Sequence, residues 1–589
     1  MTASLLMSLL ALSSTLDGPV EPADLVLSNG AVYTVNPAQP WAEAVAVRDG
    51  AIVFVGTTVE AEAYVGPATG VVDLEGRMML PGLHDSHVHI LEAFHAASGT
   101  CALPSGVSPE THIPRLQACA PNQVGTDWVL GYGHSIYDLL DHIGVGGRPP
   151  IEILDEAVPD QPVVILEETS HSAWANSEAL AAAGIDASTP NPPGGVIVKD
   201  VTTGEPNGIL LDAAGELLFD LALAPNPELE ALNDQALDEG LAFAARHGIT
   251  SLVDARAYWR RGYVEAWQRA EQQERLTARV IASLWAYPYL DDGEQIATLS
   301  ALYTNDPTSR LRFSQIKIYS DGEIGHTTAA LLEPYLCCEL ADPTGLNYFD
   351  QARLTQYITA LEPLGFDFHI HAIGDRGVHE ALNAVEAAEA INCPPGGGTC
   401  TERRHRLTHV ELVQPDDVPR FAGLGVIADL QMSHQYVLPP FQFDFAFLLG
   451  APRILERSWQ LRSLHEAGAR IVLSSDYDVG EISPFVGMRN ALTRGDQSLP
   501  DLDAAIRAYT IDAAFLMRQE DRVGSIEVGK LADLVVVDRN LFELDPAQLG
   551  EAQVDITLVE GEAVFGDLEL DLFSDGFESG STSAWSQAP

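Results

Sequence analysis

The stretch "PGLHDSHVHI", residues 81–90, places three histidines within six positions directly after a Pro-Gly turn. In a β-strand, side chains two residues apart point to the same face, so His87 and His89 lie side by side and His84 points to the opposite face. Two adjacent imidazoles are typical of a metal site, whereas a single histidine is more often structural. The rest of the chain must therefore supply further ligands.

Seven more apolar, β-rich runs follow between residues 240 and 480, and they alternate with amphipathic helical stretches. They cover residues 248–255, 278–286, 312–320, 366–372, 404–412, 425–431 and 469–476. With 82–89 in front they make eight strands, and eight βα units close naturally into a barrel. The pattern predicts an α/β protein with a (β/α)8 TIM barrel over residues 81–520. A Pro- and Gly-rich segment at about 100–215 interrupts the alternation and is expected to be an insertion over the barrel mouth.

Short β-rich segments precede and follow the barrel. Both "ADLVLSNGAVYTVNP" before it and "GSIEVGKLADLVVVDRN" after it contain short apolar strands, with Asn-Gly or Asp-Gly hairpin turns in the first segment. We expect residues 23–80 and 521–566 to pair into one small composite β-sandwich, the alternative being two separate β units. Residues 567–589 form a polar C-terminal tail in this prediction.

The charge balance excludes one class of partner. The 589 residues include 84 acidic and 32 basic ones, for a net charge of −52, which repels phosphate backbones and argues against nucleic acid. Only three lysines occur, namely Lys199, Lys317 and Lys530. An acid-rich, lysine-poor surface suits a salty medium.

The N-terminal residues 1–22 have the apolar core and following small residues of an export signal, although the usual positive start is missing. No later run of 18 apolar residues occurs, so we predict no membrane span and a periplasmic or secreted location, the alternative being a disordered cytosolic N-terminus.

An even number of cysteines permits disulfides in an exported chain, with the pairing left open. The six are Cys101, Cys119, Cys337, Cys338, Cys393 and Cys400.

Polar residues recur at the carboxyl ends of the predicted strands, where barrel enzymes assemble their sites. They are His87 and His89 on the first strand, Lys317 on the fourth, His371 on the fifth, His409 on the sixth and Asp476 on the eighth. Four imidazoles and a carboxylate suit Zn²⁺ or another divalent first-row metal. A lysine ammonium has no lone pair, but carboxylation by CO₂ would turn Lys317 into an anionic bridging ligand.

Several motifs together resemble the amidohydrolase superfamily. They are "PGLHDSHVH", "KIYSDGEIGHTTAALLEPY", "HIHAIGDRGVHEAL", "RHRLTHVEL", "SSDYDVGEISPF" and "GSIEVGKLADLVVVD". The chain is most similar to amidohydrolase family 3, which includes proteins like N-substituted formamide deformylase, over roughly residues 23 to 566. The resemblance implies metal ligands at His87, His89, His371, His409 and Asp476, with Lys317 as the carboxylated bridging residue. These residues would hold one or two zinc ions per chain.

The resemblance implies a hydrolase that cleaves a C–N bond of amide, formamide or N-acyl type in a small-molecule substrate. A metal-activated hydroxide would attack the carbonyl, with Asp476 as the catalytic proton shuttle. His171, Asp321, Gln431 and His434 are predicted substrate-binding residues. Two alternatives stay open: a carboxylic ester or lactone hydrolase on the same site, and a catalytically silent periplasmic metal- or ligand-binding protein.

A homo-oligomer is compatible with the sequence. The tail "FSDGFESGSTSAW" resembles a C-terminal motif of exported proteins from some Gram-negative bacteria.

Overall fold

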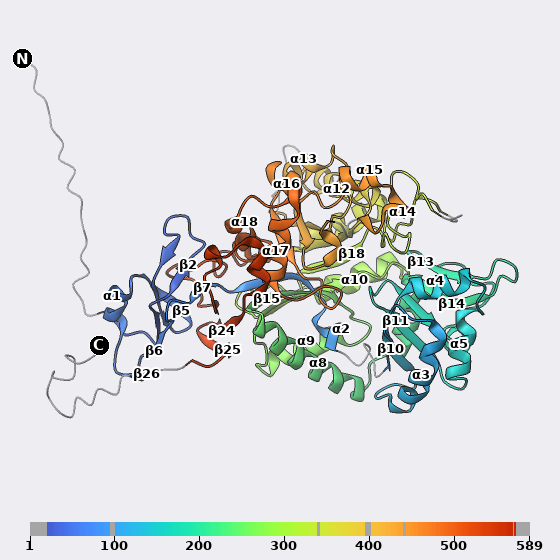
Figure 1. Cartoon of the computed structure of the whole chain (residues 1–589), viewed down its shortest axis with the longest axis horizontal. Coiled ribbons are helices and arrows are strands. Elements are labelled where there is room, and N and C mark those ends of the chain that lie inside the picture. Colours follow the sequence, from blue (N-terminus) through green and yellow to red (C-terminus); the bar gives the residue numbers. More distant parts are fainter. Residues whose placement is uncertain are drawn as a thin grey trace, which may run out of the picture.

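The central body is a barrel of eight parallel strands (Figure 1). The computed structural model describes residues 20–94, 101–337, 342–394, 402–439 and 443–568, and the backbone of 571–572. The barrel strands run in chain order as β8 (Leu83–Val88), β15 (Ile249–Ala257), β16 (Arg279–Trp285), β18 (Gln315–Tyr319), β19 (Asp367–Ala372), β20 (Arg406–His409), β21 (Ile427–Gln431) and β22 (Ile471–Ser474). All eight predicted strands are confirmed.

The first and last strands meet at their carboxyl ends and bring the barrel close to full closure. The backbone N–H of Asp476 donates to the carbonyl of His87 over 2.8 Å, and that of His89 donates to the carbonyl of Tyr477 over 2.7 Å. These two bonds place the loop after β22 directly beside the histidines of β8.

Helices cover the outside of the barrel because each carries one apolar face. Asp350 caps the start of α11 (Gln351–Leu361) by accepting from the N–H of Arg353, and the helix buries Leu354, Ile358 and Leu361 at helical spacing. The other α-helices described between consecutive strands are α9 (Tyr263–Gln272), α10 (Asp292–Leu302), α12 (Asp375–Asn392), α13 (Val418–Leu424), α14 (Ala446–Leu449), α15 (Ala451–Arg457) and α16 (Leu461–Glu466), while α8 (Pro227–Arg246) precedes β15.

The two ends of the chain form the predicted small β-structure, at the left in Figure 1. One sheet joins both termini in the order β25 (Glu562–Phe565), β24 (Val554–Val559), β23 (Leu534–Val537), β7 (Met78–Pro81), β2 (Ala31–Tyr33) and β3 (Trp41–Ala42). The other has the order β26 (Asp571–Leu572), β6 (Gly70–Asp73), β1 (Leu25–Ser28), β4 (Ala44–Arg48) and β5 (Ala51–Gly56). Leu27 and Val45 of one sheet share a buried cluster with Val536 and Ile556 of the other. The exact domain boundaries stay a prediction.

The segment between β8 and β15 builds a six-stranded sheet of its own, at the right in Figure 1. Its order is β13 (Gly195–Lys199), β14 (Pro206–Asp212), β12 (Ser172–Ala175), β11 (Val163–Glu167), β10 (Val129–His134) and β9 (Cys101–Ala102). A disulfide joins Cys101 to Cys119, at the end of α3 (Ile113–Cys119). Cys337 and Cys393 are also in disulfides, and Cys338 and Cys400 lie outside the described residues.

Among the helices that the structure describes, none has the length and apolar character needed to cross a bilayer. The predicted signal segment and C-terminal tail lie almost entirely outside the described ranges.

Candidate active site

The six predicted metal-site residues meet at the carboxyl end of the barrel. All are buried, with exposed fractions of 8% or less. They are His87 in β8, His89 just after it, Lys317 in β18, His371 in β19, His409 at the end of β20, and Asp476 two residues after β22. Parallel barrel strands all end on the same side, so residues as far apart in sequence as His87 and Asp476, 389 positions, converge here in space.

Asp476 lies at the centre of the histidines. Its Oδ1 is 3.1 Å from Nε2 of His89 and 3.3 Å from Nε2 of His87. His87, His409 and Asp476 offer donor atoms that all lie within 4.8 Å of one another, a spacing that one metal ion can bridge. Burial raises the pKa of Asp476, but the hydrogen bond with His89 and the charges of His409 and His89 outweigh it and hold that pKa well below its usual range. The carboxylate is therefore ionised at neutral pH.

His371 offers a nitrogen that the protein itself does not use. Its ring stacks on Tyr319 at a centroid distance of 3.9 Å and lies 4.4 Å from the ring of His409. Its Nδ1 is buried without a hydrogen-bond partner. A buried, unsatisfied nitrogen beside three further ligands fits a metal-binding role, because leaving it unpaired costs free energy.

Lys317 is fully buried between imidazoles. Its Nζ lies 3.3 Å from Nε2 of His87 and 3.5 Å from Nε2 of His369. Burial lowers the pKa of Lys317 well below its ordinary value, and no carboxylate of the described chain forms an ion pair with it. A lower pKa favours the neutral amine, whose lone pair can combine with CO₂.

A polar layer beneath these residues was not predicted from the sequence. His87, His369 and Asp429 form a second group with donor atoms within 4.8 Å. The guanidinium of Arg406 contacts both partners, with Nη2 2.5 Å from Nδ1 of His369 and Nε 3.3 Å from Asp429. Because the guanidinium of Arg406 already contacts His369 and Asp429, we do not interpret this second group as a metal site. It holds the side chains of His87 and Lys317 in position. His369 and His371 repeat the spacing of His87 and His89, and that repeat was the available signal.

The ring of His89 is held from its other side by an ion pair. Its Nδ1 lies 3.2 Å from Oε2 of Glu92, and Nε of Arg256 lies 3.0 Å from the same oxygen. The pair orients His89 so that Nε2 faces Asp476, as carboxylates commonly do for metal-binding histidines. Glu92 follows His89 by three residues, at the start of a helix, and could have been noticed; Arg256 could not.

A cavity of about 140 Å³ opens above the candidate ligands. His89, His409 and Asp476 form part of its lining, together with Arg256 and Tyr319. Four glutamates also line it, none of which was predicted: Glu167, Glu168, Glu323 and Glu411. Burial and the neighbouring Asp321 and Asp476 raise the pKa of Glu411 to about 8. Glu167 ends β11, Glu411 lies just after β20, and Glu168 and Glu323 are in loops.

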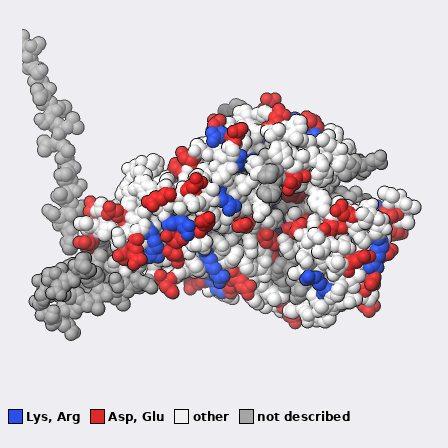
Figure 2. Space-filling model, viewed as in Figure 1, with Lys and Arg blue, Asp and Glu red and all other residues white. Residues whose placement is uncertain are grey.

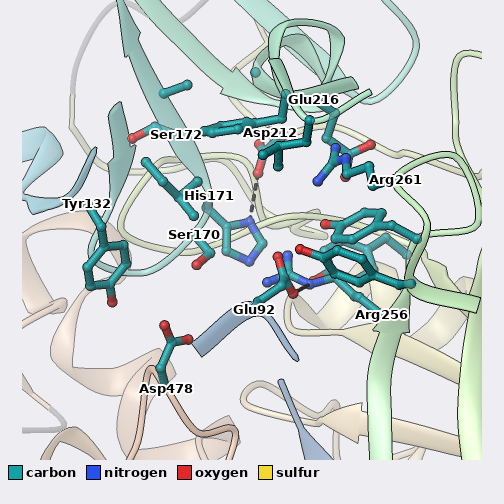
Figure 3. Close-up of a pocket in the computed structure, with 18 of the residues that line it drawn as sticks. Glu92, Tyr132, Ser170, His171, Ser172, Asp212, Glu216, Arg256, Arg261 and Asp478 are labelled. Atoms are coloured by element: carbon teal, nitrogen blue, oxygen red, sulfur yellow. Dashed lines mark hydrogen bonds and ion pairs between the residues drawn. The ribbon is translucent and has the colours of Figure 1, made fainter. Parts of the chain in front are cut away.

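A second cavity, which we call the aromatic chamber, adjoins the first, and His171, Arg256 and Tyr319 line both (Figure 3). Its apolar walls include Tyr132, Phe219, Tyr258, Tyr263 and Tyr348, and its charged side chains include Asp212, Glu216, Arg261 and Asp478.

Of the four predicted substrate-binding residues, two contact acidic residues at or beside the site, and two are held by hydrogen bonds within the protein. His171, from the insertion, lines both cavities with its Nδ1 2.7 Å from Asp212, and His434 lies 3.9 Å from Asp476. His434 lines neither cavity, and the same holds for Asp321 and Gln431. The Asp321 carboxylate accepts from three backbone N–H groups, and Nε2 of Gln431 donates to the hydroxyls of Thr408 and Ser474 over 2.8 Å each. These contacts indicate a structural role for both.

Backbone strain accompanies two of the candidate ligands. His409 has a φ of 74° and Asp476 a φ of 55°, in the left-handed region that non-glycine residues rarely adopt. Such conformations persist where surrounding structure enforces them and cluster at functional sites.

Comparison with known proteins agrees with this geometry. The amidohydrolase family matches residues 70–565. N-substituted formamide deformylase from Arthrobacter pascens is 28% identical over 91% of this chain and 97% of its own. Protein LONG AFTER FAR-RED 3 from Arabidopsis thaliana is 28% identical over 88% of each chain. The crystal structure of an uncharacterized metal-dependent hydrolase from Pyrococcus horikoshii OT3 has the same fold, with a TM-score of 0.67, 22% identity, and coverage of 92% of this chain and 99% of that one.

Proposed function

Because the chain belongs to the amidohydrolase family, we propose that it hydrolyses a C–N bond of amide, formamide or N-acyl type in a small molecule. The observation that carries the proposal is the convergence of four buried histidines and one aspartate at the carboxyl end of the barrel, beside a cavity that three of them line. The similarity to a formamide deformylase supports the choice of a C–N bond.

The residues present fit a divalent metal, and we propose zinc. Imidazole and carboxylate donors are the set that zinc prefers, and the unpaired Nδ1 of His371 leaves a donor available. The ligands would be His87, His89, His371, His409 and Asp476, with Lys317 joining them as a carbamate formed with CO₂. A zinc ion bound there would lower the pKa of a water molecule towards 7 and so supply hydroxide at neutral pH.

The protein's own groups then manage the proton. Asp476 is ionised and borders the cavity, so it can accept the proton of the attacking water and pass it to the leaving nitrogen. Glu92 and Arg256 hold His89 in place while this happens. The burial of every candidate ligand keeps bulk water away from the reacting carbonyl, which strengthens each electrostatic contact.

A metal-dependent rate and one matched pair of variants test the proposal. Protein purified without chelator is assayed on a panel of N-acyl amines, formamides and esters, with the bound metal measured by mass spectrometry. Asp476→Asn is expected to lower kcat on amides by about 10²- to 10⁴-fold. The control is Glu481→Gln, an exposed carboxylate on the same loop, which should change little.

Three other outcomes are informative. Turnover of esters alone would favour an ester or lactone hydrolase. Bound metal with no turnover on any substrate would favour a silent binding protein. Protein that binds no metal, even after zinc is added, would contradict the proposal.

We also propose that the protein is exported to the periplasm or secreted. The Cys101–Cys119 disulfide supports this, since disulfides persist mainly in oxidising compartments. The sequence features of residues 1–22 and of the tail point the same way. Fractionation of the native host, with an antibody against the chain, tests it.

A further inference from the structure

The aromatic chamber is walled mainly by flat rings. Tyr258 and Tyr263 meet with centroids 5.7 Å apart, and Tyr319 packs edge-on against Trp285 at 4.7 Å. Phe219 and Tyr348 complete the apolar lining. Aromatic walls favour another ring, because offset and edge-on contacts between rings add to the gain from burial.

One wall of the chamber carries a buried cation with an unused donor. Arg261 is 5% exposed, its Nε donates to Asp220 over 3.0 Å, and its guanidinium carbon lies 3.8 Å from the ring centre of Tyr258. Its Nη2 is buried without a hydrogen-bond partner. Figure 3 shows the guanidinium directed into the space between Asp212 and the tyrosines. A buried donor left unpaired is costly, so a ligand oxygen at this position would be stabilising.

Carboxyl groups stand close to that donor. Glu216 accepts from Nε1 of Trp285 over 3.3 Å, and Oδ2 of Asp212 is buried without a partner. Burial raises the pKa of Glu216 to about 7, although the nearby charge of Arg261 lowers it. Glu216 and Arg261 form no ion pair with each other among the contacts of the described chain. Both groups line the chamber, so a ligand inside it meets the guanidinium donor and the carboxyl together.

We propose that the aromatic chamber binds an uncharged hydroxyaryl arm of the substrate. The phenolic oxygen accepts from Nη2 of Arg261, and its O–H donates to the carboxyl of Glu216. A benzoate would fit less well, because four acidic side chains line the chamber, Glu92, Asp212, Glu216 and Asp478, against the two cations of Arg256 and Arg261. This inference rests on the proposed function for the rest of the substrate: His171, Arg256 and Tyr319 line both cavities, so an arm in the chamber connects to a bond at the candidate metal site.

Binding without turnover tests the chamber separately from the reaction. The probes are p-cresol, toluene and p-toluate, titrated into the full-length, metal-loaded protein and followed by ligand-observed NMR. We expect p-cresol to bind at least about tenfold more tightly than either of the others, because only it satisfies both the donor and the acceptor. Equal binding of all three, or tighter binding of p-toluate, would overturn the proposal even if the protein hydrolyses amides.

Three variants locate the effect. Arg261→Met is expected to remove the preference for p-cresol over toluene. Arg260→Met is the matched control, since Arg260 is largely outside the chamber yet pairs with the same Asp220 at 3.3 Å. Glu216→Met leaves the Asp220 ion pairs intact and should weaken p-cresol about fivefold or more, so it decides the matter if Arg261→Met does not fold. An unchanged preference in Glu216→Met would contradict the assignment.

Discussion

At the scale of single residues, Lys317 carries the sharpest prediction. Its amine is fully buried beside His87, and burial lowers its pKa, so a neutral amine is available to combine with CO₂. We expect Lys317→Ala to lose at least half of the bound metal and to lower kcat/KM by about 10²-fold or more, because an anionic bridge is removed. Acetate or propionate should partly restore both, since a small carboxylate can enter the space left by the side chain.

The control for this experiment is Lys199→Ala. Lys199 donates to backbone carbonyls within the insertion, far along the chain from the barrel ligands. It should keep its metal content and its rate. Full metal content in Lys317→Ala, with no response to added carboxylate, would show that the lysine is not a bridge.

The sequence predicted the role of a residue only where that residue lies at the carboxyl end of a predicted strand. His371 and His409 end two apolar runs, and that position is where barrel sites form. Arg256 directly follows the predicted strand 248–255, but an arginine there gave no sign of a metal site, and Glu323 lies in a loop; only the folded chain brings both beside the ligands. Asp321 is different: this polar residue at a strand end accepts from backbone N–H groups and does not line either cavity, and its role in substrate binding stays a prediction.

At the scale of elements, Asp321 joins two loops that follow neighbouring strands. Its Oδ1 accepts from the N–H of Ile373, and its Oδ2 accepts from the N–H groups of Gly374 and Ala330. The loop after β18 is thereby tied to the loop after β19. In Asp321→Asn the new NH₂ group would face N–H donors. We expect unfolding free energy to fall by about 2–4 kcal/mol, measured by denaturant titration.

Metal content per folded molecule should stay at the wild-type value in Asp321→Asn, since the residue lines neither cavity. Wild-type stability together with a raised KM would instead support the prediction that Asp321 binds substrate.

Strands and helices were easier to predict from the sequence than loops. Parallel barrel strands are buried on both faces and read as continuous apolar runs, whereas loop positions depend on contacts made across the whole chain.

At the scale of the whole molecule, the dominant feature is the net charge of −52. Figure 2 shows acidic side chains spread over the visible face with few basic ones among them. Each pair of exposed carboxylates repels, and the compact state brings these charges closer together than the unfolded chain does. Salt shortens the range of that repulsion, from a Debye length of about 10 Å at 0.1 M to about 3 Å at 1 M.

The melting temperature is therefore expected to rise by several degrees between about 0.02 M and 0.5 M KCl, and to change less above that range, where little repulsion remains to be screened. Screening depends on ionic strength rather than on the identity of the ion, so NaCl and KCl should give the same curve. Sorbitol at matched osmolality should not reproduce it. A melting temperature that stays flat or falls with KCl would mean that surface repulsion is already balanced within the folded chain, and that the acidic composition has no bearing on the stability of the barrel.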